Sequence, residues 1–263
     1  MTSPTGHGAG FGAGFGEGFD ERQPVVLLLD TSASMGRPAE RPRIEELNAA
    51  LAAWFDGVRR HARLRSRVEV CLITFDSRVR AWDPRQECLV PVESVPADGL
   101  FVPVDGMRPP RLGASGFTRM TDAVETALAV ARSRYRALQE RRVPVRRPFL
   151  WVLTDGAPSD AEGRPLDADA LAGTARSLRL GEERGEWVFQ AIGVRGADLG
   201  LLRVLAPKAA LKLDTLDFSQ ILDLLFQSSD RVGAVLDPDE IHTRVAEDAA
   251  LRERMDRLEK GVL

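Results

Sequence analysis

The sequence predicts an α/β fold, with a doubly wound, mostly parallel central sheet, helices on both faces and one short antiparallel edge strand. Short continuous apolar runs, typical of strands buried on both faces, alternate with longer segments whose apolar residues recur at helical spacing. Two of these runs end in an aspartate, at Asp30 and Asp155. The chain has 263 residues, of which 44% are hydrophobic. This is enough for one generous domain, and we expect no second full domain.

The elements follow one another in a regular order from Pro24 onward. Apolar runs predict strands at 25–29, 68–75, 148–154, 187–194 and 210–213, and a hairpin at 79–82 and 89–92. Apolar residues at helical spacing predict helices at 44–58, 121–139, 171–184, 199–205 and 218–228. Because strands alternate with helices, we expect the strands to run parallel and the helices to cover both faces.

The two ends of the chain differ from this central part. Residues 1–23 form a glycine-rich, low-complexity tail that we expect to be disordered. Residues 24–232 form the domain. Residues 233–263 begin near Asp237 and predict a charged amphipathic helix, which either docks on the domain or meets a partner.

Composition excludes several classes of protein. The net charge is -3, so no global field draws the chain to nucleic acid or to anionic lipid. No apolar stretch is long enough to span a bilayer, and the first residues do not form a signal peptide. Cys71 and Cys88 are too few for a disulfide framework and are expected to be reduced thiols. These features predict a soluble, cytoplasmic protein.

The first motif with chemical potential is Asp30-Thr31-Ser32-Ala33-Ser34. An aspartate leaves a buried strand, and two hydroxyls follow at two-residue intervals. Carboxylate and hydroxyl oxygens are hard ligands that suit Mg²⁺, Mn²⁺ or Ca²⁺. Taken alone, this loop is equally typical of plain helix capping.

Two further loops favour a metal site. Thr118 lies in a glycine-rich loop that leads into the helix predicted from 121, and Asp155 lies in the Thr-Asp-Gly sequence at another strand end. Ligands of such sheets bind beyond the carboxyl ends of the strands. We therefore expect Asp30, Ser32, Ser34, Thr118 and Asp155 to meet at one edge. Thr121 is interpreted as a first-turn helix residue and not as a ligand.

This trio of motifs resembles the metal-ion-dependent adhesion site (MIDAS) of von Willebrand factor A (VWA) domains, over roughly residues 24–229. The resemblance implies that Ser32 and Ser34 bind the metal directly. It implies that Thr118 joins them in the ligand-engaged form, and that Asp30 and Asp155 hold metal-bound waters or bind directly. It further implies a divalent-cation-dependent protein-protein interaction module, in which Mg²⁺, or Mn²⁺ or Ca²⁺, binds a Glu or Asp carboxylate of a partner.

Within that family, the chain is most similar to the TerY-like (YegL-like) proteins of the bacterial tellurium-resistance group. The phrases Pro-Val-Val-Leu-Leu-Leu-Asp-Thr-Ser-Ala-Ser-Met and Phe-Leu-Trp-Val-Leu-Thr-Asp-Gly-Ala-Pro-Ser-Asp carry this resemblance. It implies a role in a stress-response or phage-defence system, with a protein kinase or a PP2C-like phosphatase as partner. The chain lacks the C-terminal zinc-ribbon cysteines of some relatives.

The alternative is a metal-dependent phosphoryl-transfer enzyme that uses Asp30. A phosphotransferase of the haloacid dehalogenase type needs a second aspartate where Ser32 stands, and Lys208 and Lys212 are poorly placed as its lysine. No P-loop string exists, and Phe117 breaks the serine-hydrolase elbow around Ser115. The sequence therefore predicts no catalytic residue and no enzyme. A third interpretation is a fold of the same type whose metal site holds no ion. The presence of all five ligand residues in the sequence argues against it.

Overall fold

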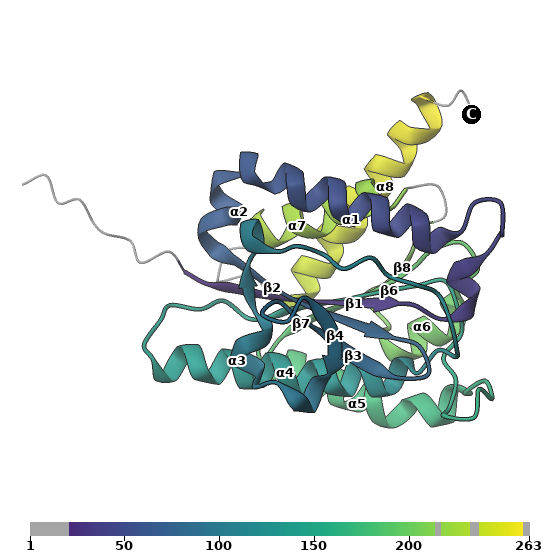
Figure 1. Cartoon of the computed structure of the whole chain (residues 1–263), viewed down its shortest axis with the longest axis horizontal. Helices are drawn as coiled ribbons and strands as arrows, with labels where there is room; N and C mark the ends of the chain where they lie inside the picture. The colour runs from purple at the N-terminus through teal and green to yellow at the C-terminus, as the bar shows by residue number, and fades with distance from the viewer. Residues whose placement is uncertain (1–20, 214–216, 232–236, 260–263) are drawn as a thin grey trace, which may run out of the picture.

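The computed structural model describes residues 21–213, 217–231 and 237–259. It confirms the predicted α/β class, with a mostly parallel sheet, an antiparallel edge and helices on both faces (Figure 1). The prediction of a disordered tail falls, for residues 1–20, outside the described residues.

The sheet has eight strands in the order β4-β3-β2-β1-β6-β7-β8, with β5 paired to β2. Their bounds are β1 Gln23–Asp30, β2 Val68–Phe75, β3 Val79–Asp83, β4 Cys88–Pro91, β5 Val102–Pro103, β6 Phe149–Thr154, β7 Val188–Gly193 and β8 Ala210–Lys212. Strands β2, β1, β6, β7 and β8 pair in parallel. The predicted hairpin, β3 and β4, forms the antiparallel edge. The two-residue strand β5 is too short for any apolar periodicity, so the sequence did not indicate it.

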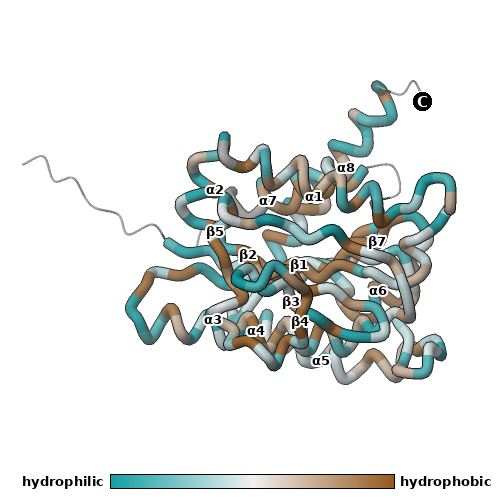
Figure 2. Tube along the Cα trace, in the orientation of Figure 1, coloured by the Kyte–Doolittle hydropathy of each residue, from teal (hydrophilic) through white to brown (hydrophobic). Residues whose placement is uncertain are grey.

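Helices cover both faces of this sheet, as Figure 1 shows. On one face lie α1 (Arg43–Gly57), α2 (Ala62–Arg67), α7 (Phe218–Arg231) and α8 (Pro238–Glu259). On the other lie α3 (Ala97–Leu100), α4 (Met120–Glu140), α5 (Ala168–Glu183) and α6 (Leu199–Leu205). Strand β1 supplies both cores, because Val25, Leu27 and Leu29 point to the first face and Val26 and Leu28 to the second. The apolar strands consequently lie inside the layers of helices (Figure 2).

The order in which successive strands are added to the sheet changes direction next to β1. From the carboxyl end of β1 it passes through the 3₁₀ turn η1 (Ala33–Gly36) to α1 on one face, whereas from β6 it passes to α5 on the other. Adjacent loops that leave to opposite faces open a crevice at the carboxyl ends of the strands, which is where ligands of such sheets bind. Asp30 ends β1 and Asp155 follows β6, so both stand at this crevice.

The predicted C-terminal helix, α8, docks on the domain through its first half. Ile241, Val245 and Ala249 are buried in the same core as α1 and α7. Its second half exposes Leu251, at 56%, and Met255, at 53%. The first half of this helix therefore packs on the domain, as one alternative predicted. The second half presents apolar side chains that could meet a partner, as the other alternative predicted.

Packing of α5 against Trp187, the residue before β7, generates a stability prediction. A Cβ at Gly181 would lie 1.8 Å from Cζ2 of the buried Trp187, whereas one at Gly173 of the same helix meets nothing within 4 Å. Gly181→Ala should therefore cost about 1–3 kcal/mol or more through overpacking. Gly173→Ala should gain up to about 1 kcal/mol from helix propensity. Urea unfolding followed by circular dichroism measures both, and equal effects of the two variants would contradict this packing.

Candidate metal-binding site

The predicted ligands of the first and third loops meet directly. Ser34 Oγ donates a hydrogen bond of 2.6 Å to Asp155 Oδ1, and the Ser32 and Ser34 hydroxyl oxygens are 2.9 Å apart. Asp30 Oδ2 accepts a bond of 2.5 Å from the Thr154 hydroxyl, which stands next to Asp155. Loops that lie more than 120 residues apart in the chain thus share one network of oxygen atoms.

Gly156 brings Thr118 into the same cluster. A Cβ built on Gly156 would lie 3.4 Å from Thr118 Oγ1, 3.5 Å from Ser34 Oγ and 3.9 Å from Asp30 Oδ2. Oxygens from the first and second loops therefore line the space beside this glycine of the third loop. The structure thus places the five predicted residues, Asp30, Ser32, Ser34, Thr118 and Asp155, in one cluster.

Backbone hydrogen bonds hold the second loop against the first. Ala33 N donates to Gly116 O at 3.1 Å, and Ser115 N donates to Thr31 O at 2.8 Å. Gly116 has φ +71° and its Cβ would lie 2.4 Å from Ser77 Oγ, so this turn requires glycine. The hydroxyl-bearing loops are consequently fixed in register by the main chain.

The second loop is held against the third by Ser159. Thr118 N donates to Ser159 Oγ at 2.9 Å, and Ser159 N donates to Thr118 O at 2.8 Å. The sequence analysis missed Ser159 and also Thr154, because their roles depend on contacts between distant loops. Thr121 lies in the first turn of α4, as interpreted from the sequence.

The carboxyl group of Asp30 lies where water does not solvate its charged form. Its side chain has no exposed surface, and burial raises the pKa of the carboxyl from 3.8 to about 6. Hydrogen bonds from Ser32 and Thr154 oppose this rise in the pKa, and the nearby charge of Asp155 adds to it. The folded protein therefore keeps a poorly solvated carboxylate at the carboxyl end of β1.

Arg43 is a member of the site that the sequence analysis missed. Its Nη1 lies 2.5 Å from Asp155 Oδ2, and the Asp155 side chain is completely buried. Arg43 is also the first residue of α1. A cation at a helix N-terminus opposes the helix dipole, so its position there is a signal that could have drawn attention to it.

The donor set fits a hard divalent cation. Two carboxylates and three hydroxyls supply oxygen alone, and oxygen is what Mg²⁺ and Ca²⁺ prefer. Because Ser34 gives its hydroxyl hydrogen to Asp155, Ser32 is the donor in the hydrogen bond between the two serines, and one lone pair of Ser34 Oγ remains for a cation. The described ranges contain no group of three or more His, Cys, Asp or Glu side chains that could hold a metal ion. The candidate metal site is therefore this mixed cluster of carboxylate and hydroxyl oxygens.

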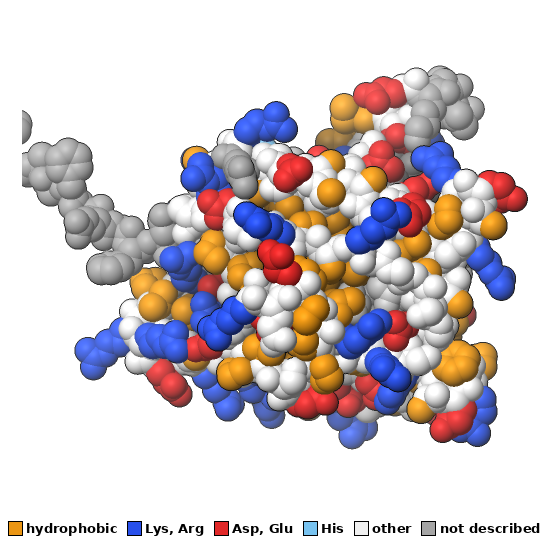
Figure 3. Space-filling model, in the orientation of Figure 1, with side chains coloured by type: hydrophobic (Ala, Val, Ile, Leu, Met, Phe, Trp, Pro, Cys, Tyr) orange, Lys and Arg blue, Asp and Glu red, His pale blue; other side chains and the backbone are white. Residues whose placement is uncertain are grey.

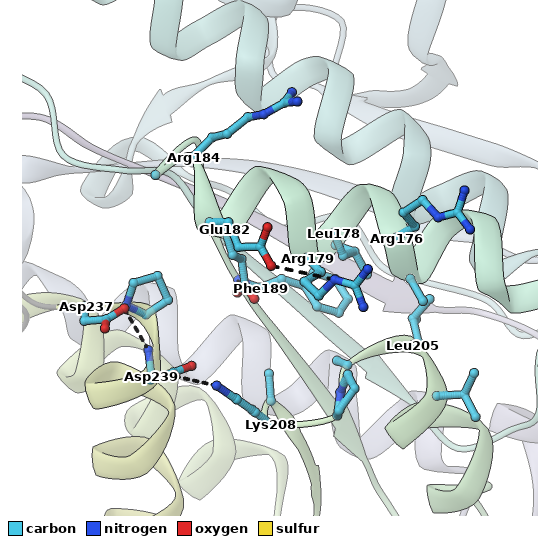
Figure 4. Close-up of a pocket in the computed structure, with 18 of the residues that line it drawn as sticks. Arg176, Leu178, Arg179, Glu182, Arg184, Phe189, Leu205, Lys208, Asp237 and Asp239 are labelled. Atoms are coloured by element: carbon cyan, nitrogen blue, oxygen red, sulfur yellow. Dashed lines mark hydrogen bonds and ion pairs between the residues drawn. The ribbon is translucent and has the colours of Figure 1, made fainter.

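A large cavity lies elsewhere in the molecule. It measures about 840 Å³ and lies between α5, α6 and the start of α8 (Figure 4). None of the five clustered residues lines it. Two of the basic side chains that line the cavity are already in ion pairs, Lys208 with Asp239 and Arg179 with Glu183. We therefore place the candidate site at the crevice beside β1 and not in this cavity.

No family model and no curated protein matches the chain, but solved structures do. One is proximal thread matrix protein 1 from the mussel byssus, 17% identical, with a TM-score of 0.45 over 81% of this chain and 46% of that chain. Another is the pilus adhesin SpaC from Lactobacillus rhamnosus GG, 13% identical, with a TM-score of 0.49 over 89% and 31%. A third is a von Willebrand factor type A protein from Catenulispora acidiphila, 19% identical, with a TM-score of 0.44 over 88% and 42%.

This chain spans less than half the length of each of these three proteins. The mussel protein has also been solved with a zinc-occupied MIDAS motif. At these identities and TM-scores, the likeness assigns no function to this chain.

The raised pKa of Asp30 predicts a pH dependence of stability. The folded pKa, about 6, exceeds the unfolded value of 3.8, so the stability that protonated Asp30 contributes is complete below the unfolded pKa and is lost as pH rises through the folded pKa. Without metal, raising the pH from about 5 to about 7 should cost about 1 kcal/mol through this group. Urea unfolding of wild type and Asp30→Asn measures it. Identical pH dependence in the two proteins would contradict the prediction.

Proposed function

We propose that this chain is a divalent-cation-dependent protein-interaction module, which uses a metal at the β1 crevice to bind a carboxylate of a partner protein. The observation that carries the proposal is the convergence of Asp30, Ser32, Ser34, Thr118 and Asp155 around the space beside Gly156. Three loops far apart in sequence supply these residues, and helix capping within any one loop does not require them to meet.

The five residues would hold the cation in two different ways. Ser32, Ser34 and Thr118 would offer neutral hydroxyl oxygens as direct ligands. Asp30 and Asp155 would supply the compensating negative charge, by holding metal-bound waters or by direct contact. A bound Mg²⁺ would supply a Lewis-acidic charge that could bind the carboxylate of a partner's Glu or Asp. Binding of the partner would then depend on the cation.

We propose further that the chain is not an enzyme. A nucleophilic Asp30 would need an accessible oxygen, but its carboxylate is fully buried, with Oδ1 accepting from Ser32 N and Oδ2 from Thr154. The described histidines also stand away from the site, His61 next to α2 and His242 in α8 against Glu182. The alternative, a metal-dependent phosphoryl-transfer enzyme, predicts turnover of p-nitrophenyl phosphate that disappears in Asp30→Ala.

The partner is proposed to be a protein with an exposed acidic residue. In Figure 3, Lys and Arg side chains alternate with Asp and Glu over the visible face, which favours neither nucleic acid nor an anionic membrane surface. No helix in the described part of the chain is both long and apolar enough to cross a membrane. A cytoplasmic location stays a proposal that rests on the composition of the chain. A tellurium-resistance-type stress or phage-defence system, with a kinase or PP2C-like phosphatase as partner, stays a proposal that rests on the sequence motifs.

Metal binding is tested by titrating Mg²⁺ and Mn²⁺ into the metal-free protein by calorimetry. Ser34→Ala removes a proposed direct ligand, and we expect at least about tenfold weaker binding. Ser94→Ala removes an exposed hydroxyl that bonds to Pro91 O, and it should leave the affinity unchanged. A wild type that binds neither cation, or equal losses in both variants, would contradict the proposed site.

A second variant tests the space beside Gly156. The added methyl of Gly156→Ala would make ordinary van der Waals contacts at 3.4 and 3.5 Å with the oxygens of Thr118 and Ser34, so the protein should fold normally. The methyl would nevertheless occupy space among the proposed ligands, and metal affinity should fall several-fold. Unfolding in urea provides the control for stability. Unchanged metal affinity would exclude this space as part of the site.

The partner chemistry is tested with an array of peptides that each carry one central Asp or Glu. A subset should bind in Mg²⁺ and lose binding in EDTA, and replacement of the central residue by Asn or Gln should abolish binding. Asp30→Ala should remove the same signals. Peptides that bind equally well in EDTA, or equally well with Asn or Gln, would count against a metal-bridged carboxylate.

A further inference from the structure

Arg43 places a positive charge inside the candidate metal site, and the proposed function does not use it. Its Nη1 lies 2.5 Å from Asp155 Oδ2 and 3.5 Å from Ser34 O. The other oxygen of Asp155, Oδ1, accepts the hydroxyl of Ser34. Both oxygens of this carboxylate, whose side chain is completely buried, are therefore satisfied by groups of the protein itself.

Helix formation does not explain an arginine at this position. Arg43 begins α1, where the positive end of the helix dipole disfavours a cation. The acidic residues of the first turn pair elsewhere, Glu45 with Arg111 at 3.0 Å and Glu46 with Arg41 at 2.6 Å. The ion pair with Asp155 is consequently the interaction that accounts for Arg43.

The charges at the site conflict once a cation enters. Asp30 and Asp155, when ionised, and Arg43 together carry a net charge of -1, which a divalent cation would turn to +1. The cation and the guanidinium would then repel each other and would draw on the same carboxylate, in surroundings where charge interactions are only partly screened. Each of the two would therefore weaken the interaction of the other with Asp155.

Space beside Arg43 allows the guanidinium to move. A cavity of about 320 Å³ is lined by Arg43 together with Val194 and Phe218. The lining also includes two acidic residues, Glu46 and Asp217, and two further basic residues, Arg41 and Arg195. Glu46 is already paired with Arg41. A guanidinium that leaves Asp155 can therefore enter an existing cavity, where Asp217 offers a second carboxylate.

From these observations we infer that Arg43 is an internal counter-ion of the metal site: it holds Asp155 in the metal-free protein and competes with the divalent cation for this carboxylate. The inference rests on the proposed function, because it assumes that a cation binds at this crevice. It goes further by naming a residue that keeps the metal affinity low. In the metal-free protein the charge of Asp155 is then neutralised by Arg43, and a higher concentration of the divalent cation is needed to fill the site.

The test is the Mn²⁺ affinity of Arg43→Gln, measured by electron paramagnetic resonance of free Mn²⁺. We expect binding about tenfold tighter than in wild type, because the competing charge is gone. Without metal, the variant should unfold at lower urea concentration, because Asp155 loses its partner. Arg179→Gln removes an exposed arginine of α5 that does not line the cavity beside Arg43, 69% exposed in its side chain, and should leave the affinity unchanged. Arg43→Lys keeps the charge and should remain close to wild type.

The outcomes separate the two proposals. If wild type and Arg43→Gln both fail to bind Mn²⁺, the proposed metal site is wrong. If wild type binds Mn²⁺ and Arg43→Gln binds it equally or more weakly, the metal site stands and the competition is wrong. A role of Arg43 in merely holding Asp155 in place predicts this weaker binding.

A measurement on the wild-type protein covers the case in which Arg43→Gln does not fold. Guanidinium protons in a buried ion pair exchange slowly with solvent. Nuclear magnetic resonance should therefore show faster exchange of the Arg43 protons at saturating Mg²⁺ than in EDTA. Equally slow exchange in both conditions, with Mg²⁺ bound, would overturn the competition.

Discussion

The burial of two carboxylates at the ends of adjacent parallel strands is the constraint on which the rest of the site depends. Asp30 and Asp155 are both buried, and transfer of such groups out of water is costly unless hydrogen bonds or opposite charges compensate. The protein compensates with Thr154 and Ser32 N at Asp30, and with Ser34 and Arg43 at Asp155. For Asp30 the compensation is incomplete, since its pKa stays raised at about 6. Ionisable groups whose pKa is shifted in this way cluster at functional sites.

The doubly wound topology explains why these carboxylates meet. Strands β1 and β6 are neighbours, and the chain leaves them toward opposite faces of the sheet, so the loops after them flank one crevice. The loop that carries Thr118 reaches the same place because its main chain bonds to Thr31, Ala33 and Ser159. The oxygens are therefore held by rigid strand ends and by backbone hydrogen bonds, which is the arrangement that precise ligand positioning needs.

Much of this could be predicted from the sequence, because the signals were local. Buried strands read as continuous apolar runs, helices as apolar residues at 3.6-residue spacing, and the three loops as aspartates and hydroxyls after strand ends. Arg43 and Ser159 could not be identified in this way. Their roles arise from contacts across 112 and 41 residues, respectively. The position of Arg43 at a helix N-terminus is an unusual local feature, but it does not indicate that the partner is Asp155. Strand β5 could not be predicted either, because a strand of two residues is too short to show an apolar periodicity.

The most direct test of the account is a crystal structure of the protein soaked in Mn²⁺, with anomalous diffraction used to locate the ion. The account predicts one strong anomalous peak at the β1 crevice, coordinated by oxygens from the cluster of Asp30, Ser32, Ser34, Thr118 and Asp155. A fully soaked crystal with no peak there, or with the ion bound elsewhere while these side chains keep their metal-free contacts, would contradict it.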